Sequence, residues 1–129
     1  MSDVMIDTLT FDNSCRIVGA MGKPQDVLQG TLDVMVLKLL ALGPLHGWGI
    51  SKRLRHLSGD VIQVHQGSLY PALYRLEDEG WISASWGAAE NGRRTKVYSI
   101  TASGKKALAA ERSRWRSLSA AVEQVLRAT

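Results

Sequence analysis

The chain has 129 residues, a formal net charge of +4 and one cysteine. This length fits one domain with one modest hydrophobic core, and a single cysteine excludes an intramolecular disulfide framework. No apolar run approaches the roughly 20 residues that span a bilayer. The first charges, Asp3 and Asp7, do not form the basic start of a signal peptide. These features favour a soluble, cytoplasmic protein without a membrane partner.

Positive charge is concentrated toward the C-terminal end. Residues 102–129 carry six Lys and Arg against two Glu, whereas residues 1–26 carry two Lys and Arg against four Asp. This gradient permits a polyanionic partner without requiring one. Residues 1–26 also show no sustained hydrophobic period, so we expect 1–22 to form a loose extension ahead of a domain at 23–101.

Two helices are predicted in the first half of the domain. Residues 27–42 are dense in Val, Leu and Met, which predicts a helix that other elements or a partner chain must nearly encircle. Gly43-Pro44 ends it. A second helix is predicted at 47–57, with its outer side carrying Lys52, Arg53 and Arg55. After the turn signal at 58–60, "VIQV" at 61–64 is short and β-prone.

The stretch "HQGSLYPALYRLEDEGWI" at 65–82 has helical spacing although it contains Pro71. A proline in a helix interior costs roughly 3 kcal/mol, but in the first turn its missing N–H has no intrahelical partner to lose. We therefore expect the helix to begin near Gly67 or Ser68. The predicted inward row is Leu69, Ala72, Leu73 and Leu76. The outward face then carries Ser68, Tyr70, Pro71, Tyr74 and Arg75.

A basic β-hairpin is predicted after this helix. The segments "WISASW" and "KVYSI" alternate in polarity, and Asn91-Gly92 between them is a strong hairpin-turn dipeptide. The tip and the returning limb carry Arg93, Arg94 and Lys96. "TASG" follows, with Thr101 as the expected N-cap of a last helix that runs to about Leu126.

The last helix carries two apolar rows with a spacing of seven residues. The rows are Leu108, Trp115 and Val122, and Leu118 with Val125, although Glu111 interrupts the second. Heptad spacing is typical of a helix that packs along another helix. We expect this seam to form a homodimer, with the first helix contributing.

The predicted order is helix, helix, short strand, helix, two-stranded hairpin, helix. This is the layout of a mainly α (α+β) winged helix-turn-helix domain with a C-terminal dimerisation helix at 102–129. The segments "QGTLDVMVLKLLALGPLHGWGISKRL", "QGSLYPALYRLEDEGWI" and "NGRRTKVYSITASGKKAL" resemble the PadR family of bacterial transcriptional regulators. The resemblance runs in order from about Lys23 to the C-terminus. Each motif is moderately specific, and together they are strong.

The resemblance implies a homodimeric regulator of transcription, usually a repressor, that binds a palindromic operator in double-stranded DNA. It implies a third helix in the major groove and a wing beside the groove. Carried over by motif, the recognition-helix positions are Gln66, Ser68, Tyr70, Tyr74 and Arg75. The wing positions are Arg93, Arg94 and Lys96. The chain is of the short type with one C-terminal helix, which leaves no separate sensor domain.

The chemistry of these residues agrees with that expectation. Polar and aromatic groups on an exposed helix face can read base edges and contact thymine methyl groups. Arginines on a hairpin suit phosphates or the minor groove. The alternative is a winged-helix module for protein–protein docking without DNA binding, in which the exposed tyrosines anchor a partner.

Other functions find less support in the sequence. No phosphate-binding loop or nucleophile elbow is present, so we expect no enzymatic activity. His46, His56 and His65 match no metal-ligand spacing, which predicts no metal and no cofactor, and His46 is expected to fix the turn before the second helix. Trp48 and Trp81 are expected in the core. Trp115 fits dimer packing, or stacking against a small apolar or aromatic effector between subunits.

Overall fold

The computed structural model of the chain describes residues 25–88 and 93–129. Its elements in order are α1 (Gln25–Leu42), β1 (Leu45–His46), α2 (Gly47–Leu57), α3 (Gln66–Asp78), β2 (Ile82–Ala88), β3 (Arg94–Ile100) and α4 (Ala102–Leu126). The strands of the described part form an antiparallel sheet in the order β1-β3-β2. The mainly α architecture with a small β-hairpin is therefore confirmed. The expected extension at 1–22 and the Asn91-Gly92 turn lie outside the described residues.

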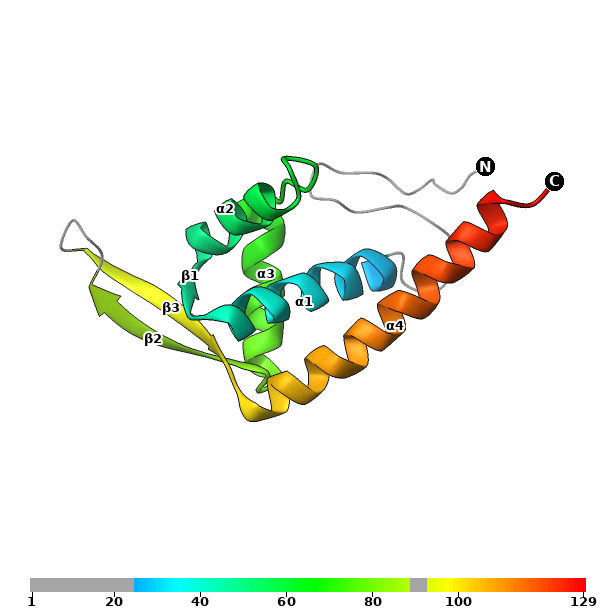
Figure 1. Cartoon of the computed structure of the whole chain (residues 1–129). Coiled ribbons are helices and arrows are strands. Elements are labelled where there is room, and N and C mark those ends of the chain that lie inside the picture. The colour runs from blue at the N-terminus through cyan, green and yellow to red at the C-terminus, as the bar shows by residue number, and fades with distance from the viewer. Residues whose placement is uncertain (1–24, 89–92) are drawn as a thin grey trace.

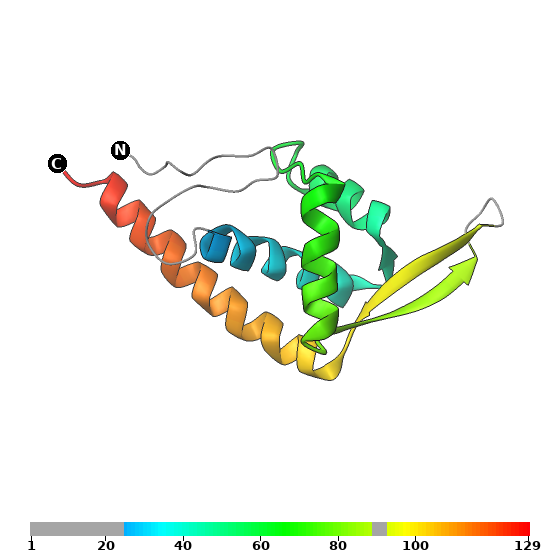
Figure 2. The same ribbon diagram turned by 180° about the vertical axis from the view of Figure 1, so that it is seen from behind.

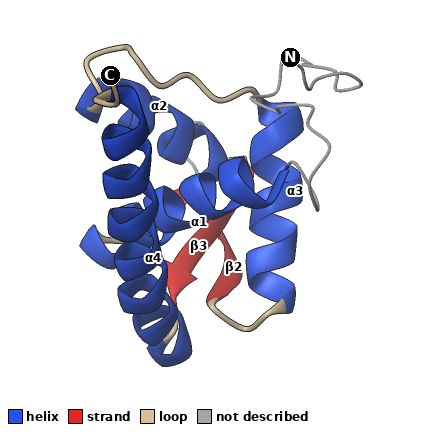
Figure 3. Cartoon of the chain, turned by 90° about the vertical axis from the view of Figure 1, so that its right-hand side faces the viewer, coloured by secondary structure: helices blue, strands red, loops and turns tan. Residues whose placement is uncertain are grey.

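Helix α1 lies at the centre of the helical layer. Figure 3 shows it between α4 on one side and α3 on the other, and it makes contacts with both. The β2–β3 hairpin projects away from the helices, and α4 runs along the opposite side of the molecule (Figure 1). The structure therefore separates the hairpin, which we call the wing, from the long terminal helix.

One hydrophobic core joins the helices to the root of the wing. Its most deeply buried members are Val36, Leu37, Leu39, Leu40, Ile50, Leu54, Leu69, Leu73, Leu76, Ile82 and Tyr98. The predicted inward row of α3 is confirmed, because all four of its members are buried. Each large aliphatic side chain buried in this way contributes roughly 1.5–3 kcal/mol. This burial leaves the opposite face of α3 open.

The start of α3 differs from the prediction. The helix begins at Gln66, so Pro71 is its sixth residue rather than a member of the first turn. Proline at this position removes the hydrogen bond to the carbonyl of Gly67, four residues earlier. Gly67 and Pro71 are both exposed, so water can solvate that carbonyl. Because solvent exposure lowers the cost of a proline in the helix, α3 can begin one or two residues earlier than predicted.

The short strand also lies elsewhere than predicted. Residues 61–64 form no strand, and the short strand β1 precedes α2 instead of following it. Leu45 pairs with Tyr98 and His46 with Val97 on the free edge of β3. A segment forms a strand only where it can pair with the edge of another strand. Residues 45–46, between α1 and α2, lie beside the edge of β3, and residues 61–64 pair with no strand.

Side chains cap two of the helices as predicted. The Nδ1 atom of His46 accepts a hydrogen bond from the backbone N–H of Gly49 at 3.0 Å, at the start of α2. Thr101 caps α4, since its Oγ1 accepts from the N–H of Gly104 at 3.0 Å. The Thr101 hydroxyl also donates to the carbonyl oxygen of Gly80 at 2.7 Å. The end of α3, the root of the wing and the start of α4 therefore meet at one junction.

Gly104 is required for the close approach at this junction. A Cβ atom at Gly104 would lie 2.0 Å from the carbonyl oxygen of Trp81, so we expect Gly104→Ala to destabilise the fold by roughly 1–3 kcal/mol or to prevent folding. Gly67→Ala is the control, because a Cβ there meets open space and should stabilise α3 by up to about 1 kcal/mol. Urea unfolding of both variants checks this. Equal midpoints for Gly104→Ala and the wild type would contradict it.

Candidate nucleic-acid interface

The exposed face of α3 is the first part of the candidate interface. In Figure 2 this helix lies in front of the other helices, with the wing beside it. Tyr74 is 75% exposed and Tyr70 is 47% exposed. Gln66 is exposed at the start of the helix and Ser68 is half-buried. Gln66, Tyr70 and Tyr74 therefore follow one side of α3 from its first turn to its third, whereas Ser68 lies at the other border of the exposed face.

Tyr70 is held in place by the helix before it. A Cβ atom at Gly47 would lie 2.6 Å from the Tyr70 hydroxyl oxygen and 2.9 Å from the nearest ring carbon. The end of the tyrosine ring therefore lies close against the backbone of α2 at Gly47. Tyr74 lies one turn further on and projects into solvent. The two tyrosines thus differ in how closely they contact the rest of the fold.

Arg75 does not lie on this face, which corrects its predicted outward orientation. Its guanidinium forms an ion pair with the carboxylate of Asp33 on α1. The Asp33 side chain is 9% exposed and the Arg75 side chain is 32% exposed. The helical spacing left this outcome open, because Arg75 lies at the border between the buried and exposed faces. A buried carboxylate on a neighbouring helix decides its direction.

The Asp33 carboxylate is buried and is also influenced by nearby acidic side chains. Burial raises its pKa to about 6, although Arg75 acts in the opposite direction. Glu111 of α4 and Glu79 after α3 add to the rise. Glu111 accepts a hydrogen bond from Arg114 at 2.6 Å and lies against Gly30 of α1. Charged groups from α1, α3 and α4 therefore meet around Asp33.

The wing is the second part of the candidate interface. In its register, Trp86 lies opposite Lys96, and Ala88 lies opposite Arg94. The Arg94 guanidinium lies 5.0 Å from the centre of the Trp86 ring, and Trp86 is 60% exposed. Such a cation–π contact is worth about 0.5–1 kcal/mol at an exposed site. It holds the arginine against the strand.

Lys96 connects the wing to α3. Its Nζ lies 3.5 Å from a carboxylate oxygen of Glu77 on α3 and 5.6 Å from the centre of the Tyr98 ring. A shallow cavity lies between the two elements. Its lining side chains are Tyr70, Pro71, Tyr74, Glu77, Lys96 and Tyr98. Arg93 is exposed at the start of the returning limb. The predicted wing cations therefore lie on the returning limb of the hairpin, and among them Lys96 contacts α3.

The structure also exposes aromatic residues that the sequence did not assign to a site. Trp48 was expected in the core, but it is 59% exposed; Trp81 is half-buried and packs against the core as expected. Lys52 lies over the Trp48 ring, with its Nζ 4.8 Å from the ring centre. The i, i+4 spacing of these two residues on the polar side of α2 was the available signal. Trp86 was also not assigned to the site. It lies toward the hairpin tip, where the strands extend beyond the core and leave the ring exposed.

The predicted dimer seam is unevenly covered in the single chain. Leu108 packs against the core, and Leu118 is half-buried. Trp115, Val122 and Val125 are 42%, 48% and 73% exposed. A groove of about 500 Å³ lies beside the seam between α1, α2 and α4, and its lining is mostly apolar. The distal half of α4 therefore leaves several large apolar side chains exposed, as is common at interaction sites.

Within residues 25–88 and 93–129, no three His, Cys, Asp or Glu side chains are grouped so that they could hold a metal ion. None of the helices described there is both long enough and apolar enough to cross a membrane.

An exposed third helix beside a β-hairpin wing defines the winged helix-turn-helix class. The sequence model of the transcriptional regulator PadR-like family matches residues 36–110, and the chain belongs to this family of transcriptional regulators. An uncharacterised protein of Lysinibacillus sphaericus is 30% identical over 90 residues, which are 70% of this chain and 83% of that protein. The negative transcriptional regulator PadR of Bacillus subtilis is 31% identical over 77 residues, 60% of this chain and 42% of that protein.

Solved structures agree with this assignment. A transcriptional regulator from Clostridium thermocellum is 30% identical, with a TM-score of 0.70 over 77% of this chain and 96% of that chain. A PadR-like transcriptional regulator from Bacillus cereus is 26% identical, with a TM-score of 0.65 over 80% of this chain and 98% of that chain. The fold and the family are therefore supported by sequence and structure together.

The raised pKa of Asp33 predicts a particular pH dependence of stability. Because this pKa is about 6 in the folded chain and 3.8 for an ordinary Asp, the folded state binds the proton more tightly between these values. The resulting stabilisation is complete below pH 3.8 and is lost as the pH rises through about 6. Lowering the pH from 7 to 5 should therefore raise the melting temperature of the wild type relative to Asp33→Asn. A constant difference between the two melting curves across this range would contradict the assignment.

Proposed function

We propose that the protein is a sequence-specific DNA-binding repressor that binds a palindromic operator as a homodimer. The observation that carries the proposal is the exposed face of α3, with Tyr70 fixed on α2 and Tyr74 open to solvent, beside a wing with stacked and exposed arginines. The proposed DNA-binding residues are Gln66, Ser68, Tyr70, Tyr74, Arg93, Arg94 and Lys96. Arg75 supports the helix through Asp33 instead.

The two parts of the interface suit different contacts with a duplex. The major groove admits a helix, and polar side chains on that helix can pair with base edges. Arginines beside the groove suit phosphates or the narrow minor groove, where the negative potential is strong. On α3 the amide of Gln66, the hydroxyl groups and the tyrosine rings therefore read sequence. Arg93 and Arg94 of the wing contribute mainly charge.

A dimer follows from the apolar surface of α4. Trp115, Val122 and Val125 are exposed on a helix whose distal half extends beyond α1 (Figure 1). A second copy of the same seam would bury them by twofold symmetry. Two recognition helices related in this way would read half-sites about one helical turn apart, or a multiple of it. A palindromic operator matches that symmetry.

The proposed sign of regulation is repression. The relative from Bacillus subtilis is a negative transcriptional regulator, and a dimer bound across an operator excludes other proteins from it. A small apolar or aromatic effector is the proposed regulator of binding, with Trp115 at its site. The apolar groove that this residue lines, together with Met35, Leu39, Leu108 and Arg112, supports this assignment. An effector there would contact both α1 and α4.

The two classes of DNA contact should fail in different ways. Arg93→Ala and Arg94→Ala should each weaken binding to all duplexes alike and flatten the log–log salt slope by roughly one unit per subunit. Ser68→Ala and Tyr70→Phe should relax the preferred sequence at about 1–3 kcal/mol per lost base contact. Their salt slope should stay near that of the wild type. Selection from random duplexes, followed by titration at several salt concentrations, measures both effects.

The outcomes of that experiment separate the competing interpretations. Wing variants that change the preferred sequence, with helix variants that leave it intact, would mean that the roles of α3 and the wing are reversed. A wild-type protein that enriches no sequence and shows no salt-dependent duplex binding would favour the protein-docking module. In that case the exposed tyrosines would anchor a protein partner.

The dimer is tested on α4 alone. Leu118→Glu combined with Val122→Glu should give a monomer in sedimentation, because charges would face each other across the seam. Ser113→Glu is the control, since this exposed residue lies on the opposite side of the helix, and it should sediment as the wild type does. Circular dichroism establishes that the double variant is folded. A folded dimer of that variant would show that the seam is wrongly assigned.

A further inference from the structure

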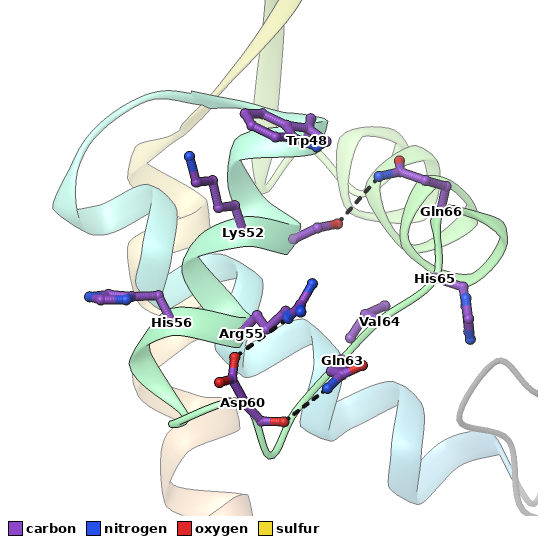
Figure 4. Close-up of a pocket in the computed structure, with 10 residues that line it drawn as sticks. Trp48, Lys52, Arg55, His56, Asp60, Gln63, Val64, His65 and Gln66 are labelled. Carbon is purple, nitrogen blue, oxygen red and sulfur yellow. Dashed lines mark hydrogen bonds and ion pairs between the residues drawn. The ribbon is translucent and has the colours of Figure 1, made fainter.

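A strip of α2 carries charge and an exposed aromatic ring that the proposed interface leaves unused. Trp48, Ser51, Lys52 and Arg55 are spaced by three or four residues along one side of the helix, and we call them the α2 strip. Helix α2 contains Lys52, Arg53 and Arg55 but no Asp or Glu. Figure 4 shows Trp48, Lys52 and Arg55 of the strip lining a pocket to which Gln66 at the start of α3 also contributes.

Trp48 is exposed and yet held in place from two sides. The His46 ring stacks on it with 6.0 Å between ring centres and 18° between planes. Lys52 lies over the indole at 4.8 Å from its centre. An indole that is 59% exposed at a fixed position is a large apolar contact surface with little conformational entropy to lose on binding.

Lys52 has no acidic partner among the residues that the structure describes. The neighbouring Arg55 differs, because its Nε lies 3.5 Å from a carboxylate oxygen of Asp60. The α2 strip therefore presents one compensated cation and one uncompensated cation beside a fixed aromatic ring. This combination fits a ligand that has a negative charge and an adjoining apolar part.

The strip adjoins the part of α3 that is proposed to enter the major groove. The Gln66 side-chain amide donates to the Ser51 hydroxyl oxygen at 3.5 Å, and Tyr70 lies on Gly47 at the start of α2. A pocket of about 600 Å³ lies between these elements, with Trp48, Lys52 and Gln66 in its lining. When a recognition helix lies in the groove, the helix before it crosses the sugar–phosphate backbone at the groove edge.

We infer that the α2 strip binds a phosphodiester of the duplex at the edge of the groove that α3 reads. Lys52 supplies the charge, the Ser51 hydroxyl supplies a hydrogen-bond donor, and the Trp48 indole packs on the adjoining deoxyribose. The inference rests on the proposed function. This inference adds to the proposed function a contact with the DNA backbone. Such a contact fixes the register of α3 on the bases without reading their sequence.

Lys52→Gln tests the charge and Lys106→Gln is its control, because Lys106 is an exposed lysine on α4 and the charge change is the same. Duplex binding is measured at several salt concentrations with the full chain. Lys52→Gln should weaken binding about tenfold at low salt and flatten the salt slope by roughly one unit per subunit. Lys52→Arg should retain the slope. Lys106→Gln should match the wild type.

Trp48→Ala tests the apolar contact separately. Because the indole carries no charge, this variant should bind severalfold more weakly while its salt slope stays that of the wild type. Neither Lys52→Gln nor Trp48→Ala should change the sequence selected from random duplexes. Thermal melting of each variant establishes that it is folded.

The alternative outcomes are distinct. A Lys52→Gln slope equal to that of the wild type would overturn the phosphate contact while the α3 variants could still behave as proposed. A changed sequence preference in Lys52→Gln would make the residue a base contact, which also overturns the inference. A wild-type protein that binds no duplex would remove the proposed function and this inference together.

Discussion

The ion pair between Asp33 and Arg75 links the two helices whose packing orients the candidate interface. It joins α1 to α3 across the core, and the Asp33 carboxylate is almost completely buried. A buried charge is tolerated only where a partner compensates for it, and removal of one partner leaves the other at high cost. The pair therefore supports the rotation of α3 that its buried row of Leu69, Ala72, Leu73 and Leu76 sets. That rotation decides which side chains face solvent and which face the core.

Much of the fold follows from the sequence, and the failures have physical causes. The α2 and α4 boundaries, both caps and the inward row of α3 were predictable, because periodicity and capping are local signals. The position of β1 was not, since it depends on a β3 edge that lies about 50 residues further along the chain. The direction of Arg75 was unpredictable in the same way. Its partner Asp33 precedes it by 42 residues.

The candidate site repeats one chemical unit at two places. Lys52 lies over Trp48 on α2, and Arg94 lies over Trp86 on the wing. In each unit an exposed ring restricts a long cationic side chain that would otherwise sample many rotamers, so less entropy is lost on binding an anion. These two tryptophans were not assigned to the site from sequence, because an aromatic residue in a polar segment resembles a core residue until its surroundings are known.

Because α4 is long and is anchored at the Thr101 junction, a small tilt at its start becomes a larger displacement at its end. The helix has 25 residues, which at 1.5 Å per residue is about 37 Å of rigid length. Its near end is tied by hydrogen bonds from Thr101 and Ser103 to the carbonyl of Gly80, and by the close contact of Gly104 with Trp81. A tilt of roughly 5° at that end displaces the far end by about 3 Å over this length. Small repacking at the root of the wing would thus become a large displacement where a second subunit would attach.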